Sequence, residues 1–268
     1  MSTTTTSATE SAPIRVGVIG AGGRMGRTIC AGIAADPAFV LVAAIDPHVA
    51  GETIAGVTVA GELDALTAAG AQVAIDFTVV SAARVSVPWL AAHGIHAVVG
   101  TTGFSDDDVG SFRAAFTTSN CLIASNFSIT AVLMMRFAEM AAPYFETAEI
   151  IELHHNGKAD APSGTAVTTA KRMAAASPEW AADPTKHEVY PGARGGIGPT
   201  GIRIHSVRLR GLQAHQEVIL GTVGQSLTIR QDSYDNSSYL PGISLACRAI
   251  GEHPGVTLGL EPLLDLGS

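Results

Sequence analysis

The chain has 268 residues, of which 47% are hydrophobic, enough to bury a substantial core in one large domain or two moderate ones. Its formal net charge of −8 argues against a general nucleic-acid or anionic-membrane surface, because no excess of basic residues exists to displace counterions. No apolar run reaches the ~18 residues that a membrane-spanning helix needs. An anionic ligand must therefore be bound by local positive charge.

Residues 1–13 are rich in serine and threonine and lack the basic start and apolar stretch of a secretory signal. We predict that they form a disordered tail of a cytoplasmic protein. The three cysteines, Cys30, Cys121 and Cys247, are far apart in the sequence. Their odd number and spacing favour buried, reduced thiols over a disulfide framework.

Residues 14–19 predict a β-branched strand, which runs into a glycine-rich turn at 20–26 and then a helix over 27–35. Glycines here let the backbone approach a pyrophosphate, which the N-terminus of the following helix stabilises. A second strand over 39–45 ends at Asp46, placed where a carboxylate accepts hydrogen bonds from an adenosine ribose. Together these features predict a dinucleotide-binding unit.

Two charged residues of this unit bear on the choice of cofactor. Asp46 favours NADH because a carboxylate repels a 2′-phosphate, whereas Arg24 in the glycine turn can offset that charge. We therefore predict that both NADH and NADPH are used. A solvated arginine at the start of a helix is the alternative for Arg24.

Further strands are predicted at residues 73–77, 96–99 and 121–124, with helical segments between them. This alternation predicts a parallel, doubly wound (Rossmann) sheet, in which ligands lie at the strand ends. Threonines and backbone N–H groups at 76–78 and 100–103 are candidates for binding the nicotinamide ribose or carboxamide, with ordinary turns as the alternative. A third such segment, 124–127, ends the last parallel strand.

The pattern changes at residues 126–130, where a helix over 131–142 leads to a strand over 149–153. Strands at 202–209, 216–222 and 226–232 follow without crossover helices and predict an antiparallel sheet. The glycine-rich segment 190–201 is expected to be a mobile loop over a site. A final helix near 243–250 is expected to pack on the first domain.

The predicted organisation is therefore a dinucleotide-binding domain over 14–127, completed by 239–268, and a second domain over 128–238. The second domain is of the α+β type with a mainly antiparallel sheet, and its expected roles are substrate binding and oligomerisation.

The segment 152–165 reads Glu-Leu-His-His-Asn-Gly-Lys-Ala-Asp-Ala-Pro-Ser-Gly-Thr. The imidazole of His154 suits proton transfer near neutral pH, and Lys158 can donate a proton or hold a carboxylate. Pro162 suits the first turn of a helix, where Ser163, Gly164 and Thr165 would expose N–H groups and hydroxyls. The segment predicts a pocket for a small anionic substrate that is protonated during the reaction.

Other interpretations compete at several of these residues. Zinc binding by Glu152, His154 and His155 is disfavoured because adjacent histidines on a strand diverge and a further ligand would have to come from elsewhere, so we predict no metal site. The same divergence leaves a structural role open for His155. Basic side chains alternate along the strand near 202–209, which favours a solvated face or a subunit interface over ligand contact. They are Arg203, His205, Arg208 and Arg210.

With these motifs in view, residues 14–266 resemble the dihydrodipicolinate reductase family of the lysine pathway. The specific part is the run 152–166, and the turns at 20–27, 100–103 and 126–128 support it in the same order. The resemblance implies NAD(P)H-dependent reduction of 4-hydroxy-tetrahydrodipicolinate, a cyclic dicarboxylate, by a homotetramer that associates through the sheet of the second domain. Some members carry an arginine after the acidic residue that suits a 2′-phosphate, whereas this chain has Pro47.

The resemblance also implies roles for individual residues. His154 is the implied catalytic acid/base and Lys158 the second proton donor. Substrate carboxylates would be bound by His155, Gly164 and Thr165, to which the helix start adds Ser163. The implied or candidate cofactor contacts are Gly20, Ala21, Gly22, Gly23, Arg24, Met25, Asp46, Phe77, Thr78, Gly100, Thr101, Thr102, Ala124, Ser125, Asn126 and Phe127.

Two other functions remain compatible with the sequence. One is a related amino-acid or imino-acid dehydrogenase on the same scaffold, which inhibition by pyridine-2,6-dicarboxylate would argue against. The other is a redox sensor that binds NAD(P)H without consuming it.

Overall fold

The computed structural model describes residues 12–266, which fall into two compact units. The first unit contains the described residues up to Ser125 and those from Ile243 onward, and the second contains Asn126–Gly242. The tail predicted at 1–13 lies almost wholly outside the described residues. Among residues 12–266, no helix combines the length and apolarity needed to cross a membrane.

The first unit is built on an eight-stranded sheet in the order β13-β7-β6-β5-β1-β2-β4-β3. Every pairing is parallel except that of β3 with β4. The chain begins at β1 in the middle of the sheet and winds outward in both directions, which confirms the predicted doubly wound fold. The strands are β1 (Ile14–Ile19), β2 (Phe39–Ile45), β3 (Thr53–Ile54), β4 (Val57–Ala60), β5 (Val73–Asp76), β6 (His96–Val99), β7 (Cys121–Ile123) and β13 (Val256–Leu258).

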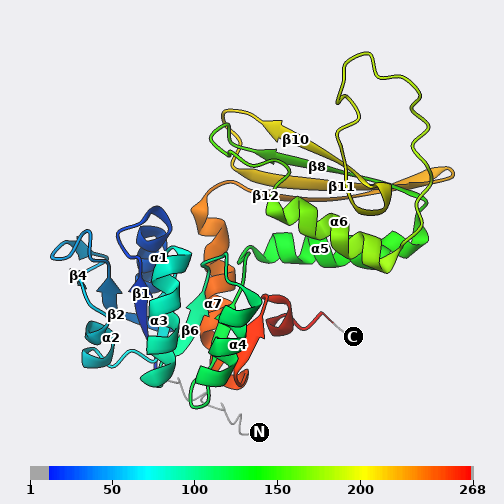
Figure 1. The fold of residues 1–268 in the computed structure, drawn as a ribbon. Coiled ribbons are helices and arrows are strands. Elements are labelled where there is room, and N and C mark those ends of the chain that lie inside the picture. Colours follow the sequence, from blue (N-terminus) through cyan, green and yellow to red (C-terminus); the bar gives the residue numbers. More distant parts are fainter. Residues whose placement is uncertain (1–11, 267–268) are drawn as a thin grey trace, which may run out of the picture. The chain divides into compact units, whose positions relative to one another are not determined.

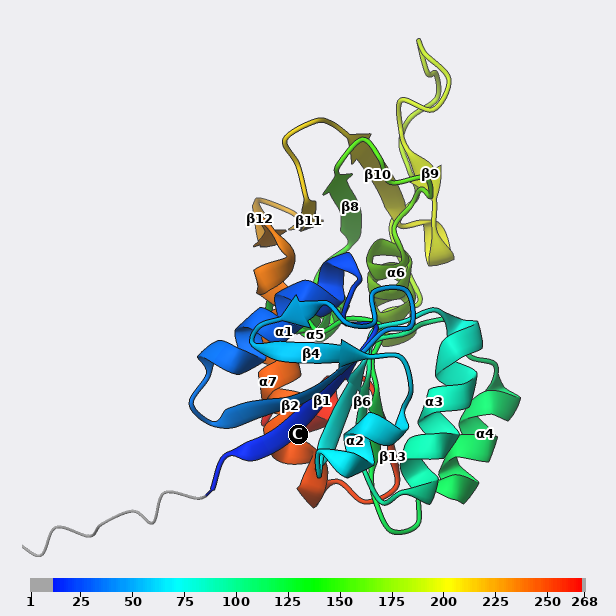
Figure 2. The same cartoon turned by 90° about the vertical axis from the view of Figure 1, so that its left-hand side faces the viewer.

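Helices cover both faces of this sheet, with α1 and α7 on one side and α3 and α4 on the other (Figures 1 and 2). The central strands carry fully buried aliphatic side chains, among them Val16, Val18, Ile75 and Val98, as expected for strands covered on both faces. The helices are α1 (Arg24–Ala35), α2 (Asp64–Ala68), α3 (Val80–Ala92), α4 (Asp106–Ala115) and α7 (Leu240–Ala249), with short 3₁₀ turns at Ile250–Glu252 and Glu261–Leu263.

The glycine turn between β1 and α1 is tighter than the sequence suggested, because the helix begins at Arg24 and not at residue 27. Gly20 has a φ of +82°, a backbone conformation that favours glycine. A Cβ at Gly26 would lie 2.0 Å from the carbonyl oxygen of Gly20, so only glycine allows the helix to pack this closely on the turn.

The second unit has a five-stranded sheet in the order β12-β11-β8-β10-β9, with α5 and α6 along one face (Figure 1). The expected antiparallel arrangement holds for every pairing except that of β8 with β10. The strands are β8 (Thr147–His154), β9 (Gly196–Ile197), β10 (Arg203–Arg208), β11 (Ala214–Thr222) and β12 (Gln225–Ser233). The helices are α5 (Ile129–Ala141) and α6 (Gly164–Ala176), with 3₁₀ turns at Ala142–Tyr144, Pro199–Gly201 and Asn236–Tyr239.

The parallel pairing of β8 with β10 departs from the predicted antiparallel sheet. β8 separates β10 from β11, because the chain leaves β8, crosses through α6 and returns as β10 in the same direction. A helical crossover of this kind requires a parallel pair. As a result, the end of β10 lies beside the end of β8, where the His-His segment begins.

The glycine-rich segment at 190–201 is attached to the sheet and does not cover the His-His segment. Gly196–Ile197 pairs with β10, and Arg194 forms ion pairs with Glu149 and Asp183. Arg203 and His205 were predicted to lie on a solvated face or a subunit interface; Arg203 forms an ion pair with Asp183, and Nε2 of His205 is hydrogen-bonded with Glu149. Because Glu149 lies near the beginning of β8 and His154 ends it, this cluster lies at the other end of the strand.

The three cysteines are buried and free, which confirms the prediction of reduced thiols. Burial raises the pKa of the Cys30 thiol to about 11 and that of Cys247 to about 12. Burial and the nearby charge of Asp76 raise the pKa of Cys121 still further. These thiols remain protonated and unreactive at neutral pH.

We expect Gly26→Ala to lower the free energy of unfolding by about 1–3 kcal/mol, because its Cβ forces the helix away from the turn. Gly110→Ala is the matched control, since a Cβ there meets nothing within 4 Å and alanine favours the exposed helix α4. Urea unfolding of both variants measures the difference. A Gly26→Ala protein as stable as the Gly110→Ala protein would contradict this packing argument.

Candidate active site

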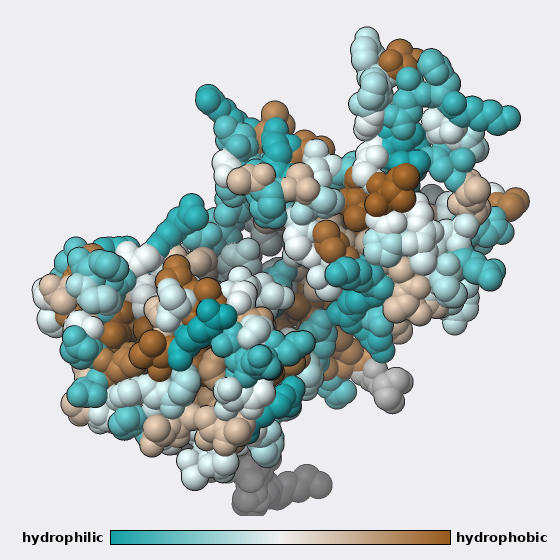
Figure 3. All heavy atoms as spheres, viewed as in Figure 1, coloured by the Kyte–Doolittle hydropathy of each residue, from teal (hydrophilic) through white to brown (hydrophobic). Residues whose placement is uncertain are grey.

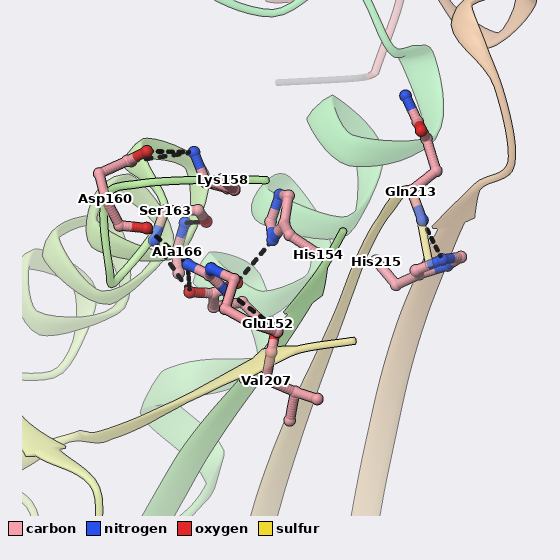
Figure 4. A network of polar contacts seen from close by, with 10 residues as sticks. Glu152, His154, Lys158, Asp160, Ser163, Ala166, Val207, Gln213 and His215 are labelled. Carbon is pink, nitrogen blue, oxygen red and sulfur yellow. Dashed lines mark hydrogen bonds and ion pairs between the residues drawn. The ribbon is translucent and has the colours of Figure 1, made fainter. Parts of the chain in front are cut away.

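The buried carboxylate of Glu152 lies at the centre of the His-His segment. Its side chain has no exposed surface, and its Oε2 accepts a 2.6 Å hydrogen bond from Nδ1 of His154. Arg208 donates from both terminal nitrogens, one to each carboxylate oxygen, at 2.8 Å. The backbone N–H of Ser163 donates to Oε1 at 3.2 Å. Figure 4 shows these contacts converging on Glu152.

The strand geometry explains why these side chains meet. Glu152 and His154 are two residues apart on β8, so they project from the same face of the sheet. Arg208 is the register partner of His154 on the neighbouring strand β10. The prediction of a solvated face is therefore wrong for Arg208, because the parallel pairing places its guanidinium against a buried carboxylate.

Lys158 lies on the turn that connects β8 to α6. Its Nζ contacts both carboxylate oxygens of Asp160, at 2.8 and 2.9 Å, and its backbone N–H donates to the carbonyl of His155. His155 follows the last residue of β8, and its Nδ1 accepts from the backbone N–H of Gly157. Asp160 is largely exposed, so its ion pair with Lys158 is weak and open to competition by another anion.

The turn ends at the N-terminus of α6, where the structure corrects one detail of the sequence reading. Ser163 is the N-cap and accepts from the N–H of Ala166, so Pro162 precedes the helix and does not begin it. The Ser163 side chain is buried, whereas Gly164 is exposed and Thr165 half-buried. The helix start therefore offers the N-terminal dipole at Gly164 and Thr165, with Ser163 fixing the cap.

The pKa values of the two central groups are both displaced downward. Burial favours the neutral imidazole and lowers the pKa of His154, while Glu152 acts in the opposite direction and the charges of Lys158 and Arg208 add to the lowering. Burial alone would raise the pKa of Glu152, but hydrogen bonds from Arg208, Ser206 and His154 outweigh it. Glu152 is therefore an anion that only accepts hydrogen bonds, which requires Nδ1 of His154 to carry the proton.

A small cavity of about 60 Å³ adjoins His154 and is lined by Thr165, Asn126, His215 and Gln216. His215 is buried, and its Nδ1 pairs with Oδ1 of Asp232 at 2.7 Å. Sequence reasoning left His215 outside every motif, because β11 brings it to this site only after the sheet has formed. Asn126, predicted to contact the cofactor, belongs to the second unit and donates to Oγ1 of Thr165 at 3.4 Å.

In the first unit the glycine turn forms a cradle at the carboxyl end of β1. A Cβ at Gly22 would lie 2.5 Å from Val49 and 2.8 Å from Oδ2 of Asp46, so only glycine lets these side chains pack this closely against the turn. Asp46 accepts from the N–H of Gly22 and of His48, both at 3.0 Å, which ties the end of β2 to the turn. This cradle fits the pyrophosphate and adenosine ribose of a dinucleotide.

Two arginines lie at this cradle. Arg27, which no motif singled out, donates to the carbonyl of Gly22 and pairs with Glu52 at 2.8 Å. Arg24 is the first residue of α1 and is exposed; among residues 12–266 its side chain has no hydrogen bond or ion pair. Arg24 is therefore available to bind a ligand, whereas the side chain of Arg27 is already bound to the Gly22 carbonyl and to Glu52.

The next two strand ends are joined by Asp76, whose side chain is completely buried. Its Oδ1 accepts from the N–H and hydroxyl of Thr78, at 3.0 and 2.7 Å, and from the hydroxyl of Thr101 at 3.1 Å; its Oδ2 accepts from Ser86. A Cβ at Gly100 would lie 2.3 Å from the ring of Phe77. The structure thus brings the predicted segments 76–78 and 100–103 together through the carboxylate of Asp76, the first residue of the earlier segment.

The remaining predicted cofactor residues are divided between the units. Ala124 and Ser125 follow β7 in the first unit, while Asn126 and Phe127 belong to the second, where Phe127 is buried. Thr102 is exposed at the end of β6, and Met25 is half-buried in the first turn of α1. Within residues 12–266 no group of three His, Cys, Asp or Glu side chains is arranged to hold a metal ion.

A glycine turn on a doubly wound sheet, together with a separate unit that carries a histidine and a lysine, is typical of an oxidoreductase that uses a nicotinamide cofactor. Comparison with known families agrees with this class. The family model for the N-terminus of dihydrodipicolinate reductase matches residues 14–127, and the model for its C-terminus matches residues 130–264. The chain belongs to the dihydrodipicolinate reductase family.

Individual relatives cover nearly the whole chain. A 4-hydroxy-tetrahydrodipicolinate reductase of Nocardia farcinica is 49% identical, covering 94% of this chain and 99% of its own length. The same enzyme of Mycolicibacterium vanbaalenii is 48% identical and is covered completely. A solved structure, the dipicolinate-bound dihydrodipicolinate reductase from Paenisporosarcina sp. TG-14, is 35% identical and covers 94% of this chain and 100% of its own, with a TM-score of 0.85.

The lowered pKa of His154 predicts a titration below the ordinary histidine value of about 6.5. Because the pKa of His154 is lower in the folded than in the unfolded protein, protonating this ring lowers the free energy of unfolding. The stabilising contribution of the neutral ring is fully present above pH ~6.5 and is lost as the pH falls through the folded pKa. NMR titration of the imidazole of His154 measures the midpoint directly. Lys158→Met should raise this midpoint by removing a nearby positive charge, and a midpoint at or above 6.5 in the unaltered protein would contradict the prediction.

Proposed function

We propose that this chain reduces 4-hydroxy-tetrahydrodipicolinate to tetrahydrodipicolinate with NADH or NADPH, in the biosynthesis of diaminopimelate and lysine. The observation that carries the proposal is the placement of His154, held by the buried Glu152 carboxylate, together with Lys158 on the turn that leads to the start of α6. Nearly full-length relatives with this activity in their names support it.

The second unit supplies the groups for a dicarboxylate. Lys158 provides a positive charge that a substrate carboxylate draws away from the exposed Asp160. Gly164 and Thr165 provide the N-terminal end of α6, and His155 adds a hydrogen-bonding ring nearby. The Ser163 hydroxyl caps the helix, so its contribution to substrate binding is to hold this anion-binding end in place. The dipicolinate bound by the solved relative is a planar dicarboxylate, which supports this substrate class.

His154 is the proposed proton donor. Its Nδ1–H is fixed on Glu152, so Nε2 is the nitrogen available to the reacting molecule. In the free protein the lowered pKa keeps the ring neutral near pH 7; a bound dicarboxylate would stabilise the imidazolium by its charge and so prime the ring to give up a proton. Lys158 is the second proposed donor, because its ammonium lies on the adjoining turn.

The first unit would hold the nicotinamide cofactor, which when bound supplies the hydride. The cradle at Gly20, Gly22 and Gly23, with Ala21, would accept the pyrophosphate, and Asp46 the adenosine ribose. Thr78, Gly100, Thr101 and Thr102 would line the nicotinamide end, with Phe77 packed beneath Gly100 and Ala124 and Ser125 beside them. Reduction requires the two units to bring their groups to one substrate, which we propose occurs by domain closure.

We further propose that the protein is a homotetramer that associates through the sheet of the second unit. The strand β12 leaves most of its first residues exposed, including Leu227, and Val223 in the preceding turn is almost fully exposed. Figure 3 shows hydrophobic residues exposed on this unit among hydrophilic ones. Burying such residues between subunits would stabilise the assembly.

His154→Gln and Lys158→Ala should each lower turnover by about 10²–10⁴-fold, the usual contribution of a positioned proton donor. Lys171→Ala is the matched control, because Lys171 lies on an exposed face of α6. The assay follows nicotinamide absorbance after the product of a dihydrodipicolinate synthase is supplied. Pyridine-2,6-dicarboxylate should inhibit competitively. Losses below about threefold in both variants would remove these two assignments.

Arg24→Ala should raise the KM for NADPH by roughly tenfold, equivalent to about 1.4 kcal/mol, and leave the KM for NADH unchanged. The reason is that Arg24 is the exposed cation at the cradle, while the neighbouring Asp46 repels a 2′-phosphate. Steady-state kinetics with each cofactor measures both values. An unchanged KM for NADPH would show that Arg24 is only a solvated residue at the helix start.

A further inference from the structure

The guanidinium of Arg208 joins three parts of the candidate site that are separate in the sequence. It spans both oxygens of Glu152, which holds His154, and its NH2 donates to the backbone carbonyl of Asp160 at 2.6 Å, in the turn that carries Lys158. Through Oε1 of Glu152 it is also one hydrogen bond away from the N-cap residue Ser163.

We propose that Arg208 is a positioning residue for proton transfer, which holds His154 through Glu152 and the Lys158 turn through the Asp160 carbonyl. This inference rests on the proposed function, since it assigns a role within that reaction. Arg208 itself is not placed to donate the proton, because its two terminal nitrogens are occupied by the carboxylate and the carbonyl.

The arrangement of the carboxylate supports this role. Each oxygen of Glu152 accepts from Arg208 and from a further part of the site: Oε2 from Nδ1 of His154, and Oε1 from the N–H of Ser163. The two-point contact of a guanidinium fixes the plane of a carboxylate, which a single hydrogen bond does not. Fixing that plane also fixes the direction in which the imidazole points.

Burial makes the guanidinium necessary. Glu152 has no exposed side-chain surface, and an unpaired carboxylate in such a place takes up a proton or turns toward water. A protonated Glu152 would no longer require Nδ1 of His154 to donate, so the ring could adopt the other tautomer. Arg208 thereby preserves both the charge of Glu152 and the tautomer of His154.

Arg208→Lys would keep the positive charge but lose the two parallel N–H donors of the guanidinium. An ammonium is a point charge that can contact one oxygen of Glu152 but cannot span both and reach the Asp160 carbonyl in the same plane. Arg208→Lys therefore separates the contribution of charge from that of geometry, while Arg208→Gln removes both.

The same strand offers a matched control. Arg203 also lies on β10, is similarly shielded from solvent and forms an ion pair with Asp183 at 2.7 Å, at the end of the strand away from His154. If Arg208 only strengthened the sheet, Arg203→Gln and Arg208→Gln would have comparable effects on turnover. A positioning role predicts that only Arg208→Gln affects proton transfer.

The experiment compares the unaltered protein with Arg208→Gln, Arg208→Lys and Arg203→Gln. It measures kcat, KM, the dissociation constant for NADH and the NMR titration midpoint of His154 in the free protein. We expect Arg208→Gln to lower kcat by roughly 10- to 100-fold, as for a displaced reacting group, with NADH binding unchanged. In Arg208→Gln the titration midpoint of His154 should move upward, because a repelling positive charge is lost. The kcat of Arg208→Lys should lie between those of Arg208→Gln and the unaltered protein. Arg203→Gln should match the unaltered protein in both quantities.

Unaltered kcat and an unmoved His154 midpoint in Arg208→Gln would overturn the inference, as would an equal loss of kcat in Arg203→Gln. If Arg208→Gln does not fold, Arg208→Lys decides: a kcat reduced at least several-fold supports the inference, and an unchanged kcat overturns it. The NMR midpoint needs no substrate. Failure of the unaltered protein to reduce its substrate would therefore refute the proposed function separately from this positioning role.

Discussion

A single buried anion, the carboxylate of Glu152, organises the candidate substrate site. A carboxylate without exposed surface is costly unless its charge and lone pairs are matched, and here they are matched by Arg208, His154 and the N–H of Ser163. These partners are the orienting arginine, the proposed proton donor and the start of the helix that would bind the substrate. Satisfying one buried charge thus assembles the chemical groups of the site.

In the first unit, too, carboxylates at the ends of strands accept several hydrogen bonds and join neighbouring segments. Asp76 has no ion pair among residues 12–266 and is stabilised by Thr78, Thr101 and Ser86, which align two strand ends on one carboxylate. Asp46 likewise joins the end of β2 to the glycine turn. In both units, a carboxylate at the end of a strand ties together backbone that would otherwise be a free loop, and the proposed ligands lie at those ends.

Local patterns were enough to predict the first unit, and much less of the second. β1 and β2 matched their predicted bounds because β-branched runs end at strong signals, a glycine turn and an aspartate. The parallel pairing of β8 with β10 was missed, since it depends on a crossover that no short pattern reveals. The roles of Arg208 and His215 were missed for the same reason: their partners, Glu152 and Asp232, become neighbours only through sheet register. The family was nevertheless identified correctly, because the run 152–166 is continuous in sequence.

The tautomer of His154 tests the account most directly, because every role assigned to Glu152 requires Nδ1 to donate to it. The measurement is the ¹⁵N chemical shift of the two ring nitrogens of His154 at a pH where the ring is neutral. We predict a protonated Nδ1 and an unprotonated Nε2, and Glu152→Gln should weaken that preference, because a neutral amide can donate as well as accept. A neutral ring with its proton on Nε2 in the unaltered protein would contradict the arrangement from which the proposed mechanism is built.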